Sequence, residues 1–281
     1  MSSKMVKIIT DTSALFTIEQ GEAMGLKVLP LCVAAGNQQF RDLCFDVSIF
    51  YDLIAKGNIP SSSQPPIGEV LEAFEACKGE EIINICMADG LSGTYQSALS
   101  AKEQASNKDD IIVLNSRTLC GPQRYLVEKA LKLTKTCKSA KEIMNKLQDS
   151  IENCGSFLIP QDFGFLKRGG RLKPAAAVVG GFLKLKPVMM QVDEGKRLDK
   201  FTISRTLTSA INTMSEHFKK LELNANYRIY ISHADALDSA KLIMDKLKQT
   251  FNECEFEMLE LSPAFITQGG PHCIAIQYIK K

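Results

Sequence analysis

Four short, continuously apolar segments alternate with helical patterns in the first half of the chain. The apolar segments are residues 6–10, 28–34, 82–87 and 111–114. An uninterrupted apolar strand is typical of a parallel sheet that is buried on both faces. Helical periodicity is found at residues 67–74, 91–105 and 124–136. This alternation of strand and helix predicts a Rossmann-like, doubly wound α/β domain.

The pattern changes in the second half of the chain. Residues 188–192 and 201–203 are apolar segments separated by a turn sequence at 193–195, which predicts a β-hairpin. Further strands are expected at 228–232, 256–261 and 273–279, and amphipathic helices at 207–218 and 236–251. The sequence therefore predicts two domains: an α/β domain with a parallel sheet over residues 1–155, and an α+β domain with an antiparallel sheet over residues 156–281.

Composition restricts the class of protein. Hydrophobic residues make up 45% of the 281 positions and charged residues 23%, which is enough for a buried core. A net charge of +2 argues against nucleic acid as the main partner. No apolar run is long enough to cross a bilayer, and the first apolar run is too short for a secretory signal. We therefore expect a cytoplasmic protein without a transmembrane segment.

The cysteine pattern indicates a reducing compartment, and the absence of cofactor motifs indicates a protein without a cofactor. The nine cysteines are odd in number and form no C-x-x-C pair, which indicates reduced thiols. Cys32, Cys86, Cys120 and Cys273 lie in or beside apolar runs and are expected to act as small hydrophobic residues. No His or Cys cluster has metal-ligand spacing and no nucleotide-binding glycine motif occurs, so we expect neither a metal nor another cofactor.

Two hydroxyl-rich segments are the main candidates for a ligand site. Residues 61–66 (SSSQPP) form an expected loop that enters a helix, and residues 89–98 (DGLSGTYQSA) directly follow a buried strand. Open α/β sheets bind ligands at such strand-to-helix loops, where the amides of the first helical turn attract an anion. Ser62, Ser92 and Thr94 can donate hydrogen bonds, and Gly93 lets a ligand approach the backbone. The alternative is that both serines are ordinary helix N-caps.

The order of several short motifs resembles the DegV family of fatty-acid-binding proteins, called FakB where a partner kinase is known. The resemblance extends over almost the whole chain and is most specific in L-S-G-T-Y-Q-S with S-Q-P upstream. The matching segments are residues 10–13 (TDTS), 40–42 (FRD), 62–65 (SSQP), 91–97 (LSGTYQS), 115–116 (NS), 169–171 (GGR), 186–187 (KP) and 269–271 (GGP).

The resemblance implies a site for the carboxylate of a long-chain fatty acid. It assigns the head group to Ser62 and Ser92, which correspond to a threonine and a serine in the family. Gly93 and Thr94, singled out above from the residues alone, complete the expected carboxylate site. Gln268 stands where the family often has a histidine, and it can donate a hydrogen bond but carries no charge. Ala88 and Asp89 replace two serines that usually precede G-L-S-G. An acidic side chain near a carboxylate is unfavourable, so Asp89 is expected to face solvent.

The resemblance also implies that the acyl tail lies between the two domains. Residues 175–182 (AAAVVGGF) are small and apolar and are flanked by phenylalanine and methionine, which suit an adaptable slot. The expected acyl-chain residues are Phe163, Phe165, Val179, Phe182 and Met189. Plain core packing is the alternative for each of them.

A local basic cluster suggests contact with a phosphate or an acidic partner. Lys167, Arg168, Arg171 and Lys173 surround two glycines. The resemblance points to Arg171 and, through the S-R-T segment, to Arg205. A solvated charged face is the alternative interpretation of the cluster.

The resemblance implies a carrier protein that is not itself an enzyme. A separate ATP-dependent fatty acid kinase (FakA-like) would phosphorylate the bound carboxylate, and the acyl phosphate would pass to phospholipid synthesis enzymes. The rival hypothesis is an autonomous serine hydrolase with Ser92 as nucleophile and His233 or His272 as base. The nucleophile-elbow motif G-x-S-x-G is not met, because Thr94 occupies the position of its last glycine.

Overall fold

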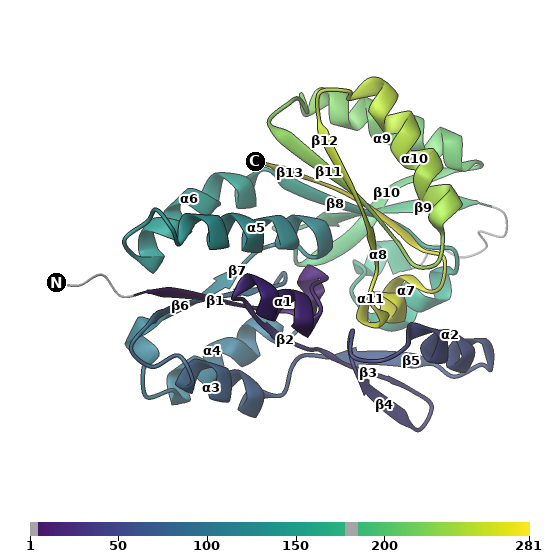
Figure 1. Cartoon of the computed structure of the whole chain (residues 1–281). Coiled ribbons are helices and arrows are strands. Elements are labelled where there is room, and N and C mark those ends of the chain that lie inside the picture. The colour runs from purple at the N-terminus through teal and green to yellow at the C-terminus, as the bar shows by residue number, and fades with distance from the viewer. Residues whose placement is uncertain (1–4, 178–184) are drawn as a thin grey trace. The chain divides into compact units, whose positions relative to one another are not determined.

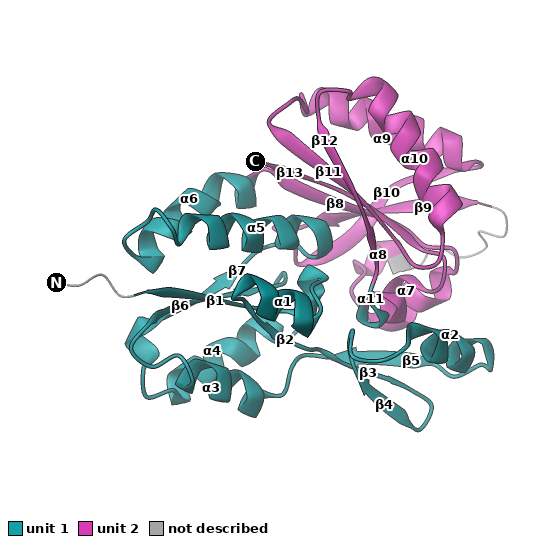
Figure 2. Ribbon diagram, viewed as in Figure 1, with its two compact units in different colours: residues 1–152, 262–264 teal, residues 153–261, 265–281 magenta. Residues whose placement is uncertain are grey.

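The computed structural model describes residues 5–177 and 185–281 (Figure 1). The chain divides into two compact units, which are coloured separately in Figure 2. Unit 1 contains Met1–Glu152 and Ser262–Ala264, and unit 2 contains Asn153–Leu261 and Phe265–Lys281. A short segment from near the end of the chain therefore belongs to unit 1.

Unit 1 is built on a four-stranded parallel sheet with strand order β2-β1-β6-β7. The strands are β1 (Val6–Asp11), β2 (Lys27–Leu29), β6 (Glu81–Cys86) and β7 (Ile111–Asn115). Their continuous apolar sequences are explained by helices on both faces, with α3 (Ile67–Glu75) and α4 (Thr94–Gln104) on one face and α5 (Cys120–Leu133) and α6 (Ala140–Glu152) on the other (Figure 1). The predicted parallel α/β class is confirmed.

The predicted single strand at residues 28–34 is wrong, because Pro30 divides it. Proline has no backbone N–H and cannot continue a ladder in the middle of a sheet. The chain leaves β2 at Leu29 and enters β3 (Cys32–Ala35), which belongs to a separate antiparallel sheet of order β4-β3-β5. The other strands of this small sheet are β4 (Gln38–Arg41) and β5 (Pro60–Ser63). Ser62 therefore lies on a strand, opposite Val33, and not in the predicted loop.

The helices of unit 1 differ from their predicted limits by a few residues. The helix expected at 91–105 begins at Thr94, and the one expected at 124–136 begins at Cys120. Three helices were not predicted: α1 (Ile18–Met24), α2 (Val47–Ala55) and α6. Short 3-10 turns complete the unit, η1 (Thr12–Ala14) and η2 (Lys108–Asp110).

Unit 2 contains a six-stranded mixed sheet of order β10-β9-β8-β13-β11-β12. Its strands are β8 (Cys154–Ile159), β9 (Lys186–Val192), β10 (Arg197–Ser204), β11 (Tyr227–His233), β12 (Glu255–Glu260) and β13 (Ile274–Lys280). All neighbours are antiparallel except β11 and β12. The predicted hairpin is confirmed as β9–β10, whose turn has positive φ at Asp193, Glu194 and Gly195.

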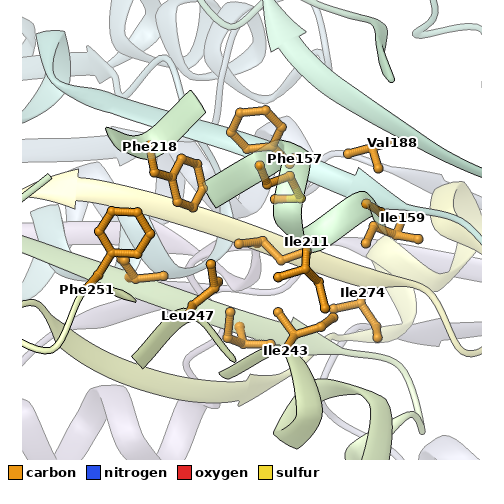
Figure 3. Close-up of a cluster of buried hydrophobic side chains, with 14 of the residues drawn as sticks. Phe157, Ile159, Val188, Ile211, Phe218, Ile243, Leu247, Phe251 and Ile274 are labelled. Atoms are coloured by element: carbon orange, nitrogen blue, oxygen red, sulfur yellow. The ribbon is translucent and has the colours of Figure 1, made fainter. Parts of the chain in front are cut away.

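Side chains on the two faces of this sheet enter two different clusters. The main core joins the sheet to α9 (Leu207–Lys220) and α10 (Leu237–Thr250), and Figure 3 shows Phe157 and Phe218 in it, with ring centroids 5.6 Å apart. A smaller cluster holds Leu158 and Met189 against α7 (Phe163–Gly169) and α8 (Pro174–Ala177). The alternation of Phe157 and Leu158 between the clusters follows from the two-residue period of a strand. The last helix is α11 (Pro263–Gly269).

All nine cysteines are free thiols, as expected. Cys86, Cys120 and Cys273 are buried, whereas Cys32 is only half-buried.

Candidate functional site

The strand order of the parallel sheet creates a switch point between β1 and β6. The chain runs from β1 outward to β2 and later enters β6 on the other side of β1. The loops that follow β1 and β6 therefore diverge at the carboxyl edge of the sheet, which is where open α/β sheets bind ligands. The segment 89–93 follows β6 at this edge, as the sequence predicted.

Hydrogen bonds from the neighbouring strand end hold this loop. The backbone amide of Asp89 donates to Oδ1 of Asn115 at 3.2 Å, and the amide of Arg117 donates to the same oxygen at 3.0 Å. The amide of Ala88 donates to the carbonyl of Thr118 at 2.8 Å. The loop is thus supported by the end of β7.

Ser92 and Thr94 form a hydroxyl pair at the start of α4. Their oxygens lie 2.8 Å apart, and the amide of Thr94 also donates to Oγ of Ser92 at 3.3 Å. Ser92 is half-buried and Thr94 is buried. The N-cap of α4 is Gly93, which provides no side-chain cap, so the interpretation of Ser92 as the N-cap is wrong. The pair can present a hydroxyl donor beside a helix N-terminus that favours an anion.

The segment that carries Ser62 lies against the same loop. A Cβ atom added to Gly93 would lie 3.2 Å from Oε1 of Gln64, two residues after Ser62. The half-buried Ser62 is fixed in register by β3, where its partner is Val33. The structure therefore brings the two predicted hydroxyl segments together within unit 1.

Asp89 is predicted to face solvent, but the structure shows it half-buried. Its Oδ2 accepts a hydrogen bond from Nε2 of Gln96 at 3.4 Å. The amide of Gln96 on the exposed side of α4 thus partly satisfies the carboxylate.

In unit 2, Gln268 and Arg171 both contact Gly169. The side-chain amide of Gln268 lies so close to Gly169 that an added Cβ atom would overlap Oε1. Arg171 donates from Nη1 to the carbonyl oxygen of Gly169. Nε2 of Gln268 donates to Oγ1 of Thr267 at 3.2 Å, whereas Oε1 is buried and has no hydrogen-bond partner among the described residues. The predicted head-group residue and the predicted partner residue are therefore neighbours.

The two candidate cations, Arg171 and Arg205, differ in how deeply they are buried. Arg171 is half-buried, and burial together with the nearby charge of Arg197 lowers its pKa from the usual value. Arg205 is exposed and directly precedes Thr206, the N-cap of α9. A half-buried guanidinium held by a backbone carbonyl is better placed than an exposed one to hold a fixed geometry.

The predicted acyl-chain residues fall into three groups. Phe163 and Met189 belong to the small cluster that packs α7 and α8 against the sheet. Phe165 is buried, and Arg168 lies over its ring with Cζ 4.8 Å from the centroid. Val179 and Phe182 lie outside the described residues.

Sequence reasoning assigned no role to a buried polar network that follows β1. Oδ1 of Asp11 accepts from the amide and hydroxyl of Ser13, and that hydroxyl also contacts Oε1 of Gln123 at 2.7 Å. Thr12 donates to Oδ2 of Asp42 at 2.7 Å. Burial raises the pKa of Asp11 and of Asp42 to about 6, although hydrogen bonds oppose the shift. The motifs TDTS and FRD were visible, but nothing local to either showed that they meet.

The rival hypothesis of a serine hydrolase requires a base beside Ser92. The hydroxyl of Ser92 is paired with Thr94. Nδ1 of His233 accepts from the amide of Ala236 at 3.3 Å, and Nδ1 of His272 lies 2.7 Å from the carbonyl oxygen of Asp235. Both histidines belong to unit 2 and are engaged with their own loop.

Residues 5–177 and 185–281 contain neither a candidate metal cluster nor a membrane-spanning helix. No group of three or more His, Cys, Asp or Glu side chains in these ranges could hold a metal ion. No helix in the same ranges has the length and apolar character required to cross a bilayer.

Comparisons with known proteins agree with this architecture. A family model described as an uncharacterised protein of the DegV family matches residues 5–281. A DegV domain-containing protein of Lactococcus lactis is 30% identical over 283 residues, which cover 98% of each chain.

Solved structures show the same fold. The crystal structure of DegV from Bacillus subtilis, described as a fatty acid binding protein, has a TM-score of 0.86 and 27% identity, covering 99% of this chain and 100% of that one. A DegV family protein from Thermus thermophilus, described by its fatty acid binding, has a TM-score of 0.88 at 20% identity, covering 98% and 99%. At that identity the second likeness supports the fold alone.

Proposed function

The chain belongs to the DegV family, and from this premise we propose that it binds one long-chain fatty acid through its carboxylate. The proposed head-group residues are Ser62, Ser92, Gly93, Thr94 and Gln268. The observation that carries the proposal is the Ser92–Thr94 hydroxyl pair at the start of α4, whose N-cap residue Gly93 has no side chain, beside the switch point of the parallel sheet. The fatty acid binding described for the Bacillus subtilis relative supports the choice of ligand.

The carboxylate and the tail contribute differently to affinity. A palmitate-sized tail has about 14 methylenes, each worth roughly 0.8 kcal/mol on burial, or about 11 kcal/mol before the costs of association. A hydrogen bond to a charged group adds about 1.5–3 kcal/mol. We propose that the tail, against Phe163, Phe165, Val179, Phe182 and Met189, supplies most of the affinity, whereas the hydroxyls set the orientation.

We further propose that the protein acts as a carrier and leaves the chemistry to another enzyme. A FakA-like kinase that uses ATP would phosphorylate the bound carboxylate, and phospholipid synthesis would use the acyl phosphate. Arg171 and Arg205 are the proposed contacts for the phosphate or for an acidic surface of the kinase. This step rests on the family resemblance and on the position of Arg171 next to Gln268 at Gly169.

Mass spectrometry of lipid extracted from the purified native protein tests the ligand. We expect about one long-chain fatty acid per chain, with palmitate or oleate rebinding after delipidation. Hexadecanol, which has the same tail without the charge, should bind more weakly. Absence of lipid in the extract, together with no binding of either acid in calorimetry, contradicts the proposal. Ester hydrolysis that is lost in Ser92→Ala would instead favour the hydrolase.

A further inference from the structure

Asp42 connects segments that are remote in sequence. Asp42 is fully buried and directly follows β4. Its Oδ2 accepts from the hydroxyl of Thr12 at 2.7 Å, and its own amide donates to the carbonyl of Leu31 at 2.8 Å. Its Oδ1 accepts from the backbone amide of Ala264 at 3.0 Å. The side chain therefore joins the turn after β1 to the start of α11, and the backbone of the same residue joins the end of β4 to the segment between β2 and β3.

The bond to Ala264 acts as a cap for α11. The first amides of a helix have no partner within the helix, and a negative charge there is favourable because of the helix dipole. Ala264 is the second residue of α11, which begins at Pro263, so its amide is one of these orphan donors. The residues around it are buried, so water does not readily replace Asp42 as the acceptor.

Gln268 lies one turn further along the same helix. Residues four positions apart project from the same side of an α-helix, so a shift at Ala264 is transmitted to Gln268. The side-chain amide of Gln268 lies directly against Gly169. A small displacement at the start of α11 therefore also displaces this side chain relative to Gly169.

We propose that Asp42 is a positioning residue for head-group recognition: by capping α11 it sets the orientation of Gln268 toward the bound carboxylate. This inference rests on the proposed function, because it needs Gln268 to contact the ligand. The charged state matters, since a carboxylate is a stronger acceptor than an amide oxygen. Burial raises the pKa of Asp42 to about 6, and the charge of Asp11, which faces it, adds to the shift. The cap is therefore ionised at pH 8.

A purely structural role is the competing explanation. Asp42 also links the small sheet to β1, and losing that link would lower stability without a specific effect on the head group. The two explanations differ in what happens to the preference for acid over alcohol, because only a head-group defect changes that ratio. Exchange of amide hydrogens in α11 separately reports whether the cap exists in solution.

The experiment combines hydrogen exchange with ligand discrimination at pH 8. Exchange of the peptide covering residues 262–270 is followed by mass spectrometry in the delipidated wild type, Asp42→Asn and Asp46→Asn. Asp46 is a matched control, because its carboxylate caps the exposed helix α2 through the amide of Ser48 at 2.9 Å. The ratio of palmitate to hexadecanol affinity is measured for the same proteins. Thr12→Val, which removes one donor to Asp42, is a milder second variant if Asp42→Asn does not fold.

The expected result is specific to Asp42. Exchange in 262–270 should rise about tenfold in Asp42→Asn, the acid-to-alcohol ratio should fall about tenfold, and Asp46→Asn should change neither. Adding Gln268→Ala to Asp42→Asn should lower the ratio little further. Unchanged exchange overturns the cap, and raised exchange with an unchanged ratio overturns the link to recognition. If the wild type binds no fatty acid, the proposed function fails and takes the head-group role with it, while the exchange result still decides whether Asp42 holds α11.

Discussion

The backbone amide of Ala264 donates to Oδ1 of Asp42 across 222 positions of sequence. This bond ties the start of α11 to the end of β4, next to the residues that follow β1. The candidate head-group loops and this buried carboxylate belong to the same unit of the protein.

Ser92→Ala should lower the affinity for palmitate by about tenfold, because one hydrogen bond to a charged group is lost while tail burial remains. Hexadecanol affinity should change little. Ser100→Ala is the control, since the Ser100 hydroxyl is exposed and donates to the carbonyl of Gln96 within α4. Calorimetry of both ligands measures the effect. Loss of both ligands with the fold intact would mean that the head group, and not the tail, dominates binding.

Gly169→Ala should displace the Gln268 side chain, because the added methyl group would overlap Oε1. The side-chain amide is flexible, so the fold should survive while the affinity for palmitate falls severalfold. Gly68→Ala is the control, because a Cβ atom at Gly68 meets nothing within 4 Å. Circular dichroism checks the fold and calorimetry the affinity. An unchanged affinity in Gly169→Ala would remove Gln268 from the proposed site.

Arg171→Glu should slow acyl-phosphate formation by a partner kinase with little effect on fatty acid binding. Because Arg171 is half-buried and bonded to Gly169, Arg171→Gln is the cleaner test, since it introduces no buried negative charge. Lys167→Gln, at an exposed position of the same basic cluster, is the control. The assays are lipid binding by the isolated protein and acyl-phosphate formation with kinase and ATP. A variant that binds lipid poorly, yet is phosphorylated normally once loaded, would place Arg171 in the ligand pocket.

Asp11 and Asp42 should make the protein less stable as the pH rises from about 4 to 7. Burial raises the pKa of each carboxyl from 3.8 to about 6, so in this range the folded state binds more protons than the unfolded state. The free energy of unfolding contributed by such a group falls as pH rises, by at most about 3 kcal/mol for a shift of two units.

Urea unfolding of the wild type and Asp11→Asn at pH 5 and pH 7.5 measures this effect. The wild type should lose stability relative to the variant as the pH is raised. Asp46→Asn is the control and should show no such pH dependence, because hydrogen bonds from Ser48 lower the pKa of Asp46 below its usual 3.8 and the group is ionised in both states at pH 5 and at pH 7.5. A difference between wild type and Asp11→Asn that does not depend on pH would show that Asp11 does not titrate in this range.

The sequence was most informative where local patterns decide the structure. The β9–β10 hairpin was predictable because Asp193, Glu194 and Gly195 form a turn between two β-rich segments, and the turn fixes the register. The parallel sheet was predictable because strands buried on both faces need uninterrupted apolar runs. Helix α6 could also have been predicted, since Ile143, Leu147 and Ile151 are spaced for one buried face.

The failures come from pairings that no local pattern encodes. Ser61, Ser62 and Ser63 have little intrinsic preference for a strand, and they form β5 only because β3 pairs with them. Likewise, the motifs at 10–13 and 40–42 are short and polar, and their shared burial depends on how β1 and β4 end near each other. The hydroxyls of Ser62 and Ser92 could be singled out from sequence, whereas the residues that support them could not.

The division of the chain into units also affects how the protein is made on the ribosome. Unit 1 includes residues 262–264 of a chain of 281. The first 152 residues emerge with Asp42 present but with Ala264 not yet synthesised, so one oxygen of a buried carboxylate lacks its donor, at a cost of about 1–3 kcal/mol. Domains generally fold in order as they leave the ribosome. Here the N-terminal unit reaches its complete native state only after residues 262–264 have been translated.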